Sequence, residues 1–137
     1  MANLEIKIIE SPEAPAPMPF LSHAVAFNNV LYMSGCHGIR RDTNKVVEGG
    51  ITAQATQAME NIKHVLKAGG SSLDNVLNVV VYLADLKDYP GFNEVYKKYF
   101  KNGPPARTGF AVGALPLNSL VEVEVEAAIG NVKKVFV

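Results

Sequence analysis

An arginine near the C-terminal end of the chain stands just after a proline pair, Pro104 and Pro105. Proline fixes its own backbone and biases the residue before it toward extended geometry, so Arg107 should enter a strand in a restrained position. A guanidinium group presents several donors in a planar fork and keeps its charge, which suits a carboxylate or phosphate ligand. The pattern predicts an anion clamp. The alternative is a surface arginine in a salt bridge, which is common and weakly informative.

Small residues occupy the positions that would share a strand face with Arg107, namely Gly109, Ala111 and Gly113. Their side chains are too small to fill the space above a sheet. The spacing therefore predicts a concavity that is floored by small residues and edged by the arginine.

Three carboxylates alternate with valines between residues 120 and 127: Glu122, Glu124 and Glu126. On a strand these side chains would point to one side, about 7 Å apart, while the valines point to the core. Glu126 is expected to be a solvent-exposed residue on the surface of the sheet, without a role in chemistry. A carboxylate beside a ligand-bound water could do acid–base chemistry, and Glu122 is the favoured candidate.

Cys36 and His37 are adjacent residues of the types that form a nucleophile and its base, but neighbours on an extended chain point in opposite directions. A small buried thiol is therefore favoured over a catalytic dyad. The other histidines, His23 and His64, complete no recognisable zinc spacing with this pair. No metal site is predicted.

The 137 residues fit one domain, 1–137, and carry 13 basic and 13 acidic side chains for a net charge of zero. This balance of charges lacks the excess of basic residues that is typical of proteins that bind nucleic acid. The single cysteine suits a reducing compartment, and the first 20 residues resemble neither a signal peptide nor a usual transit peptide. No apolar segment approaches the roughly 20 residues that cross a bilayer. A soluble, cytoplasmic protein without a membrane partner is expected.

The pattern of apolar residues and turn signals predicts strands, a helix, a strand, a second helix and more strands, which is an α+β order. A proline-rich lead-in loop covers residues 11–19. Asp88 is expected to cap the second helix, with Pro90 in its first turn. The expected strands are 6–9, 24–27, 30–34, 76–83, 108–112 and 120–129, and the first helix is 51–68.

The strand expected at 76–83 is apolar on both faces, with Leu77 and Val79 on one and Val76 and Val80 on the other. Two helices can cover only one face of a mixed sheet. The second face is therefore predicted to be buried against other copies of the chain, as a homo-oligomer.

Four separated motifs are spread over nearly the whole chain: Tyr32-Met33-Ser34-Gly35, Ala53-Gln54-Ala55-Thr56-Gln57-Ala58-Met59-Glu60-Asn61, Phe92-Asn93-Glu94-Val95-Tyr96, and Pro105-Ala106-Arg107 with Val121-Glu122-Val123-Glu124. In this order and separation they resemble the RidA family, also called YjgF or L-PSP. The resemblance implies a chorismate-mutase-like α+β fold with two helices on one face of a mixed sheet, a homotrimer, and ligand sites in the clefts between subunits.

The resemblance further implies hydrolysis of reactive 2-enamine or 2-imine acids, such as 2-aminoacrylate, to 2-oxo acids and ammonia without a cofactor. By position, Arg107 would grip the substrate carboxylate and Glu122 would position or activate the attacking water. Ser34, Gly35 and Asn93 match family cleft positions and would shape or hydrogen-bond the site.

The chain departs from the family pattern at several of these positions. Phe20 replaces a usual tyrosine, so it can wall the cleft but cannot donate a hydrogen bond, which predicts slower turnover or a more apolar ligand. Cys36 replaces a usual glutamine, and Gly109 stands where many members have cysteine. An alignment on the terminal Glu-Ala pair would select Glu124 in place of Glu122.

Two alternatives to a deaminase remain open. One is a noncatalytic trimer that binds small carboxylates for regulation. The other, less favoured because of the neutral charge, is an endoribonuclease or translation inhibitor of the L-PSP type.

Overall fold

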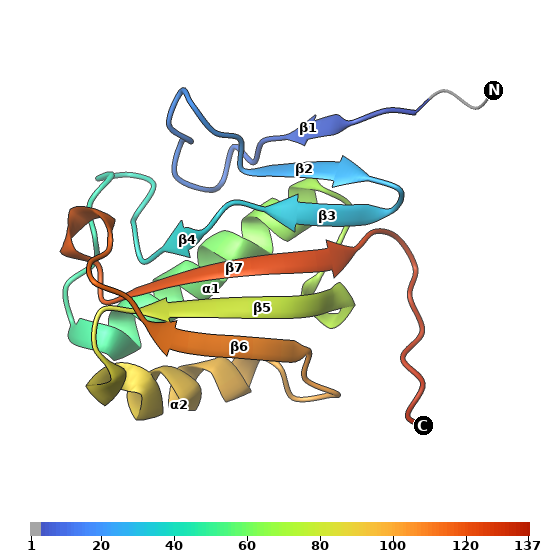
Figure 1. The fold of residues 1–137 in the computed structure, drawn as a ribbon. Helices are drawn as coiled ribbons and strands as arrows, with labels where there is room; N and C mark the ends of the chain where they lie inside the picture. The colour runs from blue at the N-terminus through green and yellow to red at the C-terminus, as the bar shows by residue number, and fades with distance from the viewer. Residues whose placement is uncertain (1–3) are drawn as a thin grey trace.

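The structure is a computed structural model that describes residues 4–137. Every helix and strand that the sequence predicts is present, with bounds shifted by at most two residues (Figure 1). The strands are β1 (Lys7–Ile9), β2 (Ala24–Phe27), β3 (Val30–Met33), β4 (Cys36–His37), β5 (Val76–Leu83), β6 (Ala106–Ala111) and β7 (Val121–Ala128); the α-helices are α1 (Gly50–Ala68) and α2 (Tyr89–Tyr99); the short 3₁₀ helices are η1 (Leu73–Asn75), η2 (Leu86–Asp88) and η3 (Pro116–Asn118).

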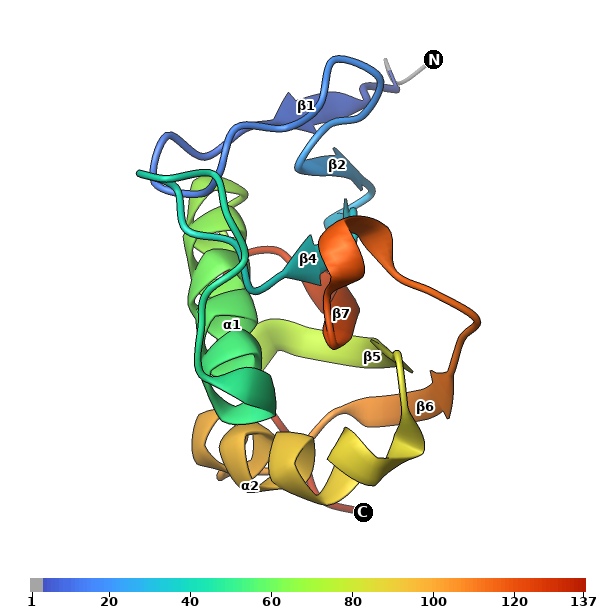
Figure 2. The same ribbon diagram turned by 90° about the vertical axis from the view of Figure 1, so that its left-hand side faces the viewer.

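The strands form one mixed sheet in the order β1-β2-β3-β7-β5-β6, and β4 also pairs with β7. Strands β5 and β6 are parallel, whereas the other pairs are antiparallel. Both α-helices lie on one side of this sheet, here called the helix face (Figure 2). The opposite side is called the open face. The predicted α+β class, with two helices on one face of a mixed sheet, is confirmed.

The hairpin between β2 and β3 turns at Asn28 and Asn29, as the sequence indicates. Both residues have positive φ angles, 50° and 61°. Two consecutive left-handed residues make a tight turn whose twist matches the flanking strands, and asparagine tolerates that conformation well.

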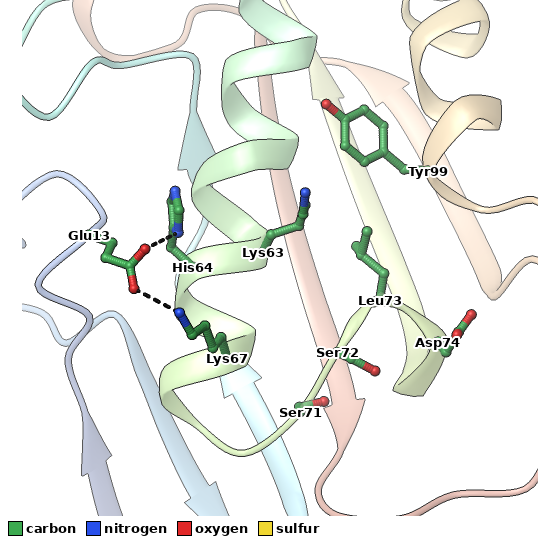
Figure 3. A pocket seen from close by; sticks show the side chains of 9 residues that line it. All are labelled: Glu13, Lys63, His64, Lys67, Ser71, Ser72, Leu73, Asp74 and Tyr99. Carbon is green, nitrogen blue, oxygen red and sulfur yellow. Dashed lines mark hydrogen bonds and ion pairs between the residues drawn. The ribbon is translucent and has the colours of Figure 1, made fainter.

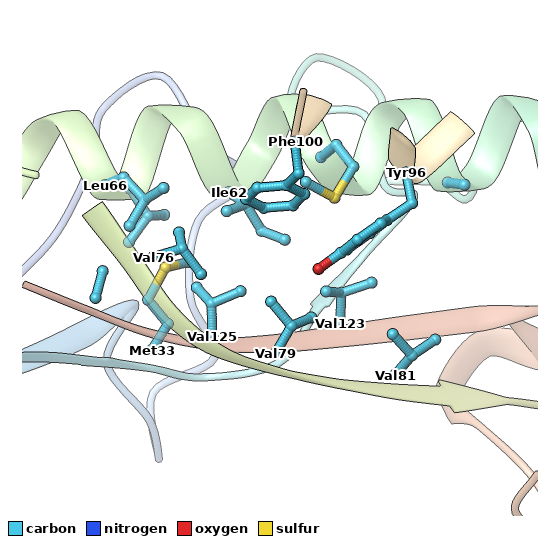
Figure 4. Packing of buried hydrophobic residues seen from close by; sticks show 14 of the residues in the cluster. Met33, Ile62, Leu66, Val76, Val79, Val81, Tyr96, Phe100, Val123 and Val125 are labelled. Atoms are coloured by element: carbon cyan, nitrogen blue, oxygen red, sulfur yellow. The ribbon is translucent and has the colours of Figure 1, made fainter. Parts of the chain in front are cut away.

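The hydrophobic core lies between the helix face and the two helices (Figure 4). Val79 and Val81 of β5 and Val123 of β7 are fully buried there, and their register brings Val81 opposite Val123. Because valines alternate with polar residues along β7, burial of one face turns the carboxylates to the open face.

Helix α2 begins at Tyr89 with Pro90 in its first turn, but the expected capping role of Asp88 is wrong. The Asp88 side chain makes no capping hydrogen bond, and its backbone is already helical (φ −86°, ψ −6°). A side-chain cap requires extended geometry, which η2 prevents because it runs directly into α2. Asp85 has that geometry and accepts a hydrogen bond from Lys87 N at 2.8 Å.

Two local irregularities of the sheet differ from the sequence prediction. A register shift between Val76 and Asn78 turns Val76 inward, at 5% exposure, and leaves Leu77 48% exposed, so these two residues exchange their expected faces. Strand β4 was not predicted, because two residues are too short to show a periodicity.

The open face retains exposed aromatic side chains. Tyr32 and Phe110 are each 44% exposed, and the Phe110 ring contacts the Tyr82 ring at 5.4 Å between centroids. No α-helix of the described chain covers this side of the sheet (Figure 2).

Candidate functional site

Arg107 lies inside β6, opposite Val79 of β5, and therefore points to the helix face. Its Nη2 donates hydrogen bonds to Asn93 Oδ1 at 2.7 Å and to Tyr89 Oη at 3.2 Å. Asn93 and Tyr89 are four residues apart on α2, so they present their side chains from the same side of the helix. The predicted site residues Arg107 and Asn93 are thus in direct contact.

Aromatic rings surround the Arg107 guanidinium. Its central carbon lies 4.5 Å from the centroid of the Tyr96 ring, 5.3 Å from that of Tyr89 and 5.7 Å from that of Phe92. Burial, opposed by the nearby Arg107 charge, raises the pKa of Tyr96 to about 12, so the Tyr96 ring is neutral at physiological pH.

No carboxylate within residues 4–137 pairs with Arg107. The alternative of a salt-bridged surface arginine is therefore wrong for this chain. A half-buried cation that neutral groups hold in place has its charge available for an external anion.

The concavity expected above the small residues of β6 is wrong where Gly109 lies. A Cβ at Gly109 would sit 2.7 Å from Tyr89 Oη, so the tyrosine already fills the space above this glycine. Gly109 accordingly gives room to a side chain that orients Arg107. Sequence reasoning assigned no role to Tyr89, although its spacing from Asn93 on a helix was a usable signal.

Glu122 lies on the other side of the sheet from Arg107. In β7 it pairs with Tyr82 of β5 and with His37 of β4, and its neighbours Val121 and Val123 point to the helix face. A Cβ at Gly35 would collide with the Glu122 carboxylate, so glycine is needed for this close approach. Glu122 is half-buried, and its Oε2 lies 3.2 Å from His37 Nε2.

Glu124, the alternative site carboxylate, has a different environment. It accepts a hydrogen bond from Tyr82 Oη at 2.7 Å, which is the main reason that the pKa of Tyr82 rises to about 12. Of the two glutamates, Glu122 is the one that contacts a predicted site residue, Gly35.

A cavity of about 330 Å³ adjoins Gly35. Phe20, Ser34, Gly35 and His37 line it together with apolar residues of the lead-in loop. Phe20 is 80% exposed at this cavity. The Ser34 hydroxyl donates a hydrogen bond to Ser22 O at 2.7 Å, so it is bonded to the segment between the lead-in loop and β2.

Cys36 and His37 form no catalytic dyad in the structure. Cys36 Sγ lies 3.9 Å from Ser34 O and packs against the core, whereas His37 turns to Glu122. Burial, with a smaller contribution from the Glu122 charge, raises the pKa of Cys36 to about 12. A protonated thiol at neutral pH is a poor nucleophile.

A second hollow, of about 590 Å³, lies beside the C-terminal half of α1 (Figure 3). There Glu13 of the lead-in loop pairs with His64 at 3.1 Å and Lys67 at 3.2 Å, and Lys67 is the main cause of the lowered pKa of Glu13. This hollow contains none of the predicted site residues. Its ion pairs tie the lead-in loop to α1.

The predicted site residues thus form two groups. The Arg107 group comprises Arg107, Asn93 and Gly109, together with Tyr89. The Glu122 group comprises Glu122, Phe20, Ser34 and Gly35, together with His37. Within one chain the charged side chains of the two groups point to opposite faces of the sheet. In residues 4–137 no three side chains of the usual metal-binding types come together, and no helix is long and apolar enough to span a membrane.

The sequence of the chain was compared with those of known protein families. A family model described as Endoribonuclease L-PSP matches residues 11–129. The chain belongs to the RidA/YjgF/L-PSP family. The Drosophila melanogaster RutC family protein UK114 is 42% identical to this L-PSP chain over 133 residues, which are 97% of the chain and 96% of the relative.

Two further relatives bear on activity and fold. The human 2-iminobutanoate/2-iminopropanoate deaminase is 38% identical over 130 residues, or 95% of each protein. The crystal structure of RidA from an Antarctic bacterium, Psychrobacter sp., matches this L-PSP fold with a TM-score of 0.86 at 38% identity, over 90% of this chain and 99% of that one.

Proposed function

We propose that the chain is a hydrolytic deaminase that converts 2-enamine or 2-imine acids, such as 2-aminoacrylate, to 2-oxo acids and ammonia. The observation that carries this proposal is the uncompensated Arg107 cation, which Asn93 and Tyr89 hold in a fixed direction. Such a group suits the carboxylate that every 2-imino acid bears. The human relative named as a 2-iminobutanoate/2-iminopropanoate deaminase gives family-level support.

The proposed site is completed between copies of the chain in a homotrimer. Arg107 and Glu122 point to opposite faces of one sheet, so a second copy is needed to bring the two groups together. The exposed aromatic residues of the open face, Tyr32 and Phe110, supply apolar surface for such an assembly. A cyclic arrangement repeats the same Arg107-to-Glu122 junction at each interface.

In the proposed reaction the main task of the protein is to position the substrate and one water molecule. An enamine such as 2-aminoacrylate first becomes the imine, as one proton leaves its nitrogen and another is added to C3. Arg107 binds the substrate carboxylate, which fixes the imine carbon next to a water held by Glu122. Glu122 takes a proton from that water as its oxygen attacks the carbon, and returns the proton to the imine nitrogen. The new hydroxyl then gives up its proton as the carbon–nitrogen bond breaks. The nitrogen, which began with one hydrogen, leaves as ammonia, and the oxygen becomes the ketone oxygen.

The test is oxo-acid release from 2-aminoacrylate that a dehydratase generates in the cuvette. Wild-type protein should accelerate release, and Arg107→Ala should lower kcat/KM by about 100-fold, because a charge-stabilising and positioning donor is lost. Arg40→Ala is the matched control, since Arg40 is an exposed arginine that already pairs with Asp42. It should behave as wild type.

The absence of acceleration by wild-type protein would overturn the deaminase proposal. Binding of a 2-oxo acid without turnover, lost in Arg107→Ala, would then identify the noncatalytic carboxylate-binding trimer.

A further inference from the structure

His37 has a place in the Glu122 group that its proximity to Cys36 does not reveal. Strand β4 pairs with β7 so that His37 lies directly opposite Glu122. Residues directly opposite each other on neighbouring strands project to the same side of a sheet. The imidazole and the carboxylate are therefore cross-strand partners, and His37 also lines the cavity beside Gly35 and Ser34.

The contact between these side chains is sheltered. His37 Nε2 lies 3.2 Å from Glu122 Oε2, and the two side chains are 15% and 23% exposed. The Nε2 atom is buried and makes no aligned hydrogen bond within residues 4–137. Among these residues, Glu122 supplies the acidic group that lies beside it. Burial of a polar nitrogen without an aligned hydrogen bond lowers the stability of the fold, so a purely structural role does not explain why this nitrogen is buried here.

The backbone of β4 is held so that this pairing persists. Asn61, a buried residue of α1, donates hydrogen bonds from Nδ2 to His37 O at 3.1 Å and to Ile39 O at 2.9 Å. The short strand is thereby fixed to a helix on one side and to β7 on the other. The imidazole is presented to Glu122 by the fold rather than by a mobile loop.

We infer that His37 is the positioning residue of Glu122: its imidazole orients the carboxylate and shares the proton that Glu122 takes from water. This inference rests on the proposed deaminase function. When the water oxygen bonds to the imine carbon, a proton of the water passes to Glu122. The imidazole stabilises the protonated Glu122 carboxyl until this proton moves to the substrate nitrogen. His37 ends the cycle in its starting state, so no further reactant is consumed.

His64 provides a matched control, because it also pairs with a glutamate. The His64 Nδ1–Glu13 Oε2 distance is 3.1 Å, but these side chains are 35% and 48% exposed and lie outside both site groups. The kinetic test compares His37→Gln with His64→Gln. His37→Gln should lower kcat about tenfold or more with KM nearly unchanged, whereas His64→Gln should leave both constants as in wild type.

A double variant tests whether His37 acts through Glu122. Glu122→Gln combined with His37→Gln should be no slower than Glu122→Gln alone, because the imidazole then has no carboxylate to assist. Full multiplication of the two single effects would overturn the inference, as would wild-type kcat in a folded His37→Gln variant. Wild-type protein without any turnover would overturn the proposed function and this role with it, which differs from the loss of the His37 effect alone.

A spectroscopic measurement on wild-type protein does not depend on the folding of the His37 variant. The chain has only three histidines, so their imidazole NMR resonances can be resolved. Addition of 2-oxobutanoate should shift the His37 resonances and leave those of His64 unchanged. Unshifted His37 resonances at a saturating concentration of this product would overturn the inference.

Discussion

Arg107 is oriented by groups that carry no negative charge, and Gly109 leaves the space for one of them. Gly109→Ala would place a methyl group 2.7 Å from Tyr89 Oη. Because a ring is rigid, Tyr89 must move away and its hydrogen bond to Arg107 should break. We expect weaker binding of 2-oxobutanoate by calorimetry and a loss of about 1–3 kcal/mol in the free energy of unfolding.

Gly113→Ala is the control for this substitution, since a Cβ there meets no atom within 4 Å. It should change neither the affinity nor the stability. Equal affinities for the Gly109 and Gly113 variants would contradict the role given to Tyr89.

Cys36 should be slow to react with alkylating reagents at neutral pH. Burial raises the pKa of its thiol to about 12, so the reactive thiolate forms only as the pH approaches that value. Alkylation by iodoacetamide, followed by mass spectrometry, should accelerate steeply between pH 8 and about pH 12 for this reason. A reaction at pH 8 as fast as that of a small model thiol would show that the thiolate is not suppressed.

At the level of single residues, the sequence predicted Arg107 and Glu122 as candidates because strand alternation and the proline pair are local signals. It did not reveal Tyr89 above Gly109, or His37 beside Glu122. Both contacts depend on the packing and register of elements far apart in the chain, which no local pattern specifies.

The lead-in loop is held by His23, which bonds to the loop with both ring nitrogens. Nδ1 accepts a hydrogen bond from Ser11 N at 3.0 Å, so the proton of the neutral ring lies on Nε2, which donates to Pro15 O at 2.7 Å. His23→Ala should therefore lower the free energy of unfolding by about 1–3 kcal/mol and speed proteolysis of the loop.

His64→Ala serves as the comparison, because it removes only a more exposed contact to the same loop. Its effect should stay below about 1 kcal/mol, as for other surface ion pairs. Limited proteolysis and thermal melting of both variants decide the matter, and equal effects would refute the special role of His23.

Among the elements, the hairpin and α1 were predicted closely because Asn28-Asn29 and a helical apolar stripe are strong local signals. The exchange of faces at Val76 and Leu77 could not be predicted, since a register shift depends on how β5 meets β7. Strand β4 exists through its pairing with β7 rather than through any preference of its own two residues.

The assembly of the whole molecule is a prediction from its uncovered sheet face. Sedimentation equilibrium should give three times the 14.8 kDa mass of the chain. Phe110→Glu places a charge on the open face, where the native ring is 44% exposed, and should favour the monomer. Thr56→Glu, on an exposed position of α1, should leave the mass unchanged. A monomeric wild-type protein at micromolar concentration would contradict the trimer.

For the molecule as a whole, the apolar character of both faces of β5 indicated association, and the motifs indicated the family. The partition of the site into two groups could not be predicted. It arises because β6 turns Arg107 to the helix face while β7 turns Glu122 to the open face, and this depends on the strand register.

That partition has a genetic consequence. If each interface joins Arg107 of one subunit to Glu122 of the next, two dead alleles, Arg107→Ala and Glu122→Gln, should complement each other. Every mixed ring of three then contains one interface in which both residues are intact. Random reassembly of equal amounts should restore about a quarter of wild-type activity from two inactive parents.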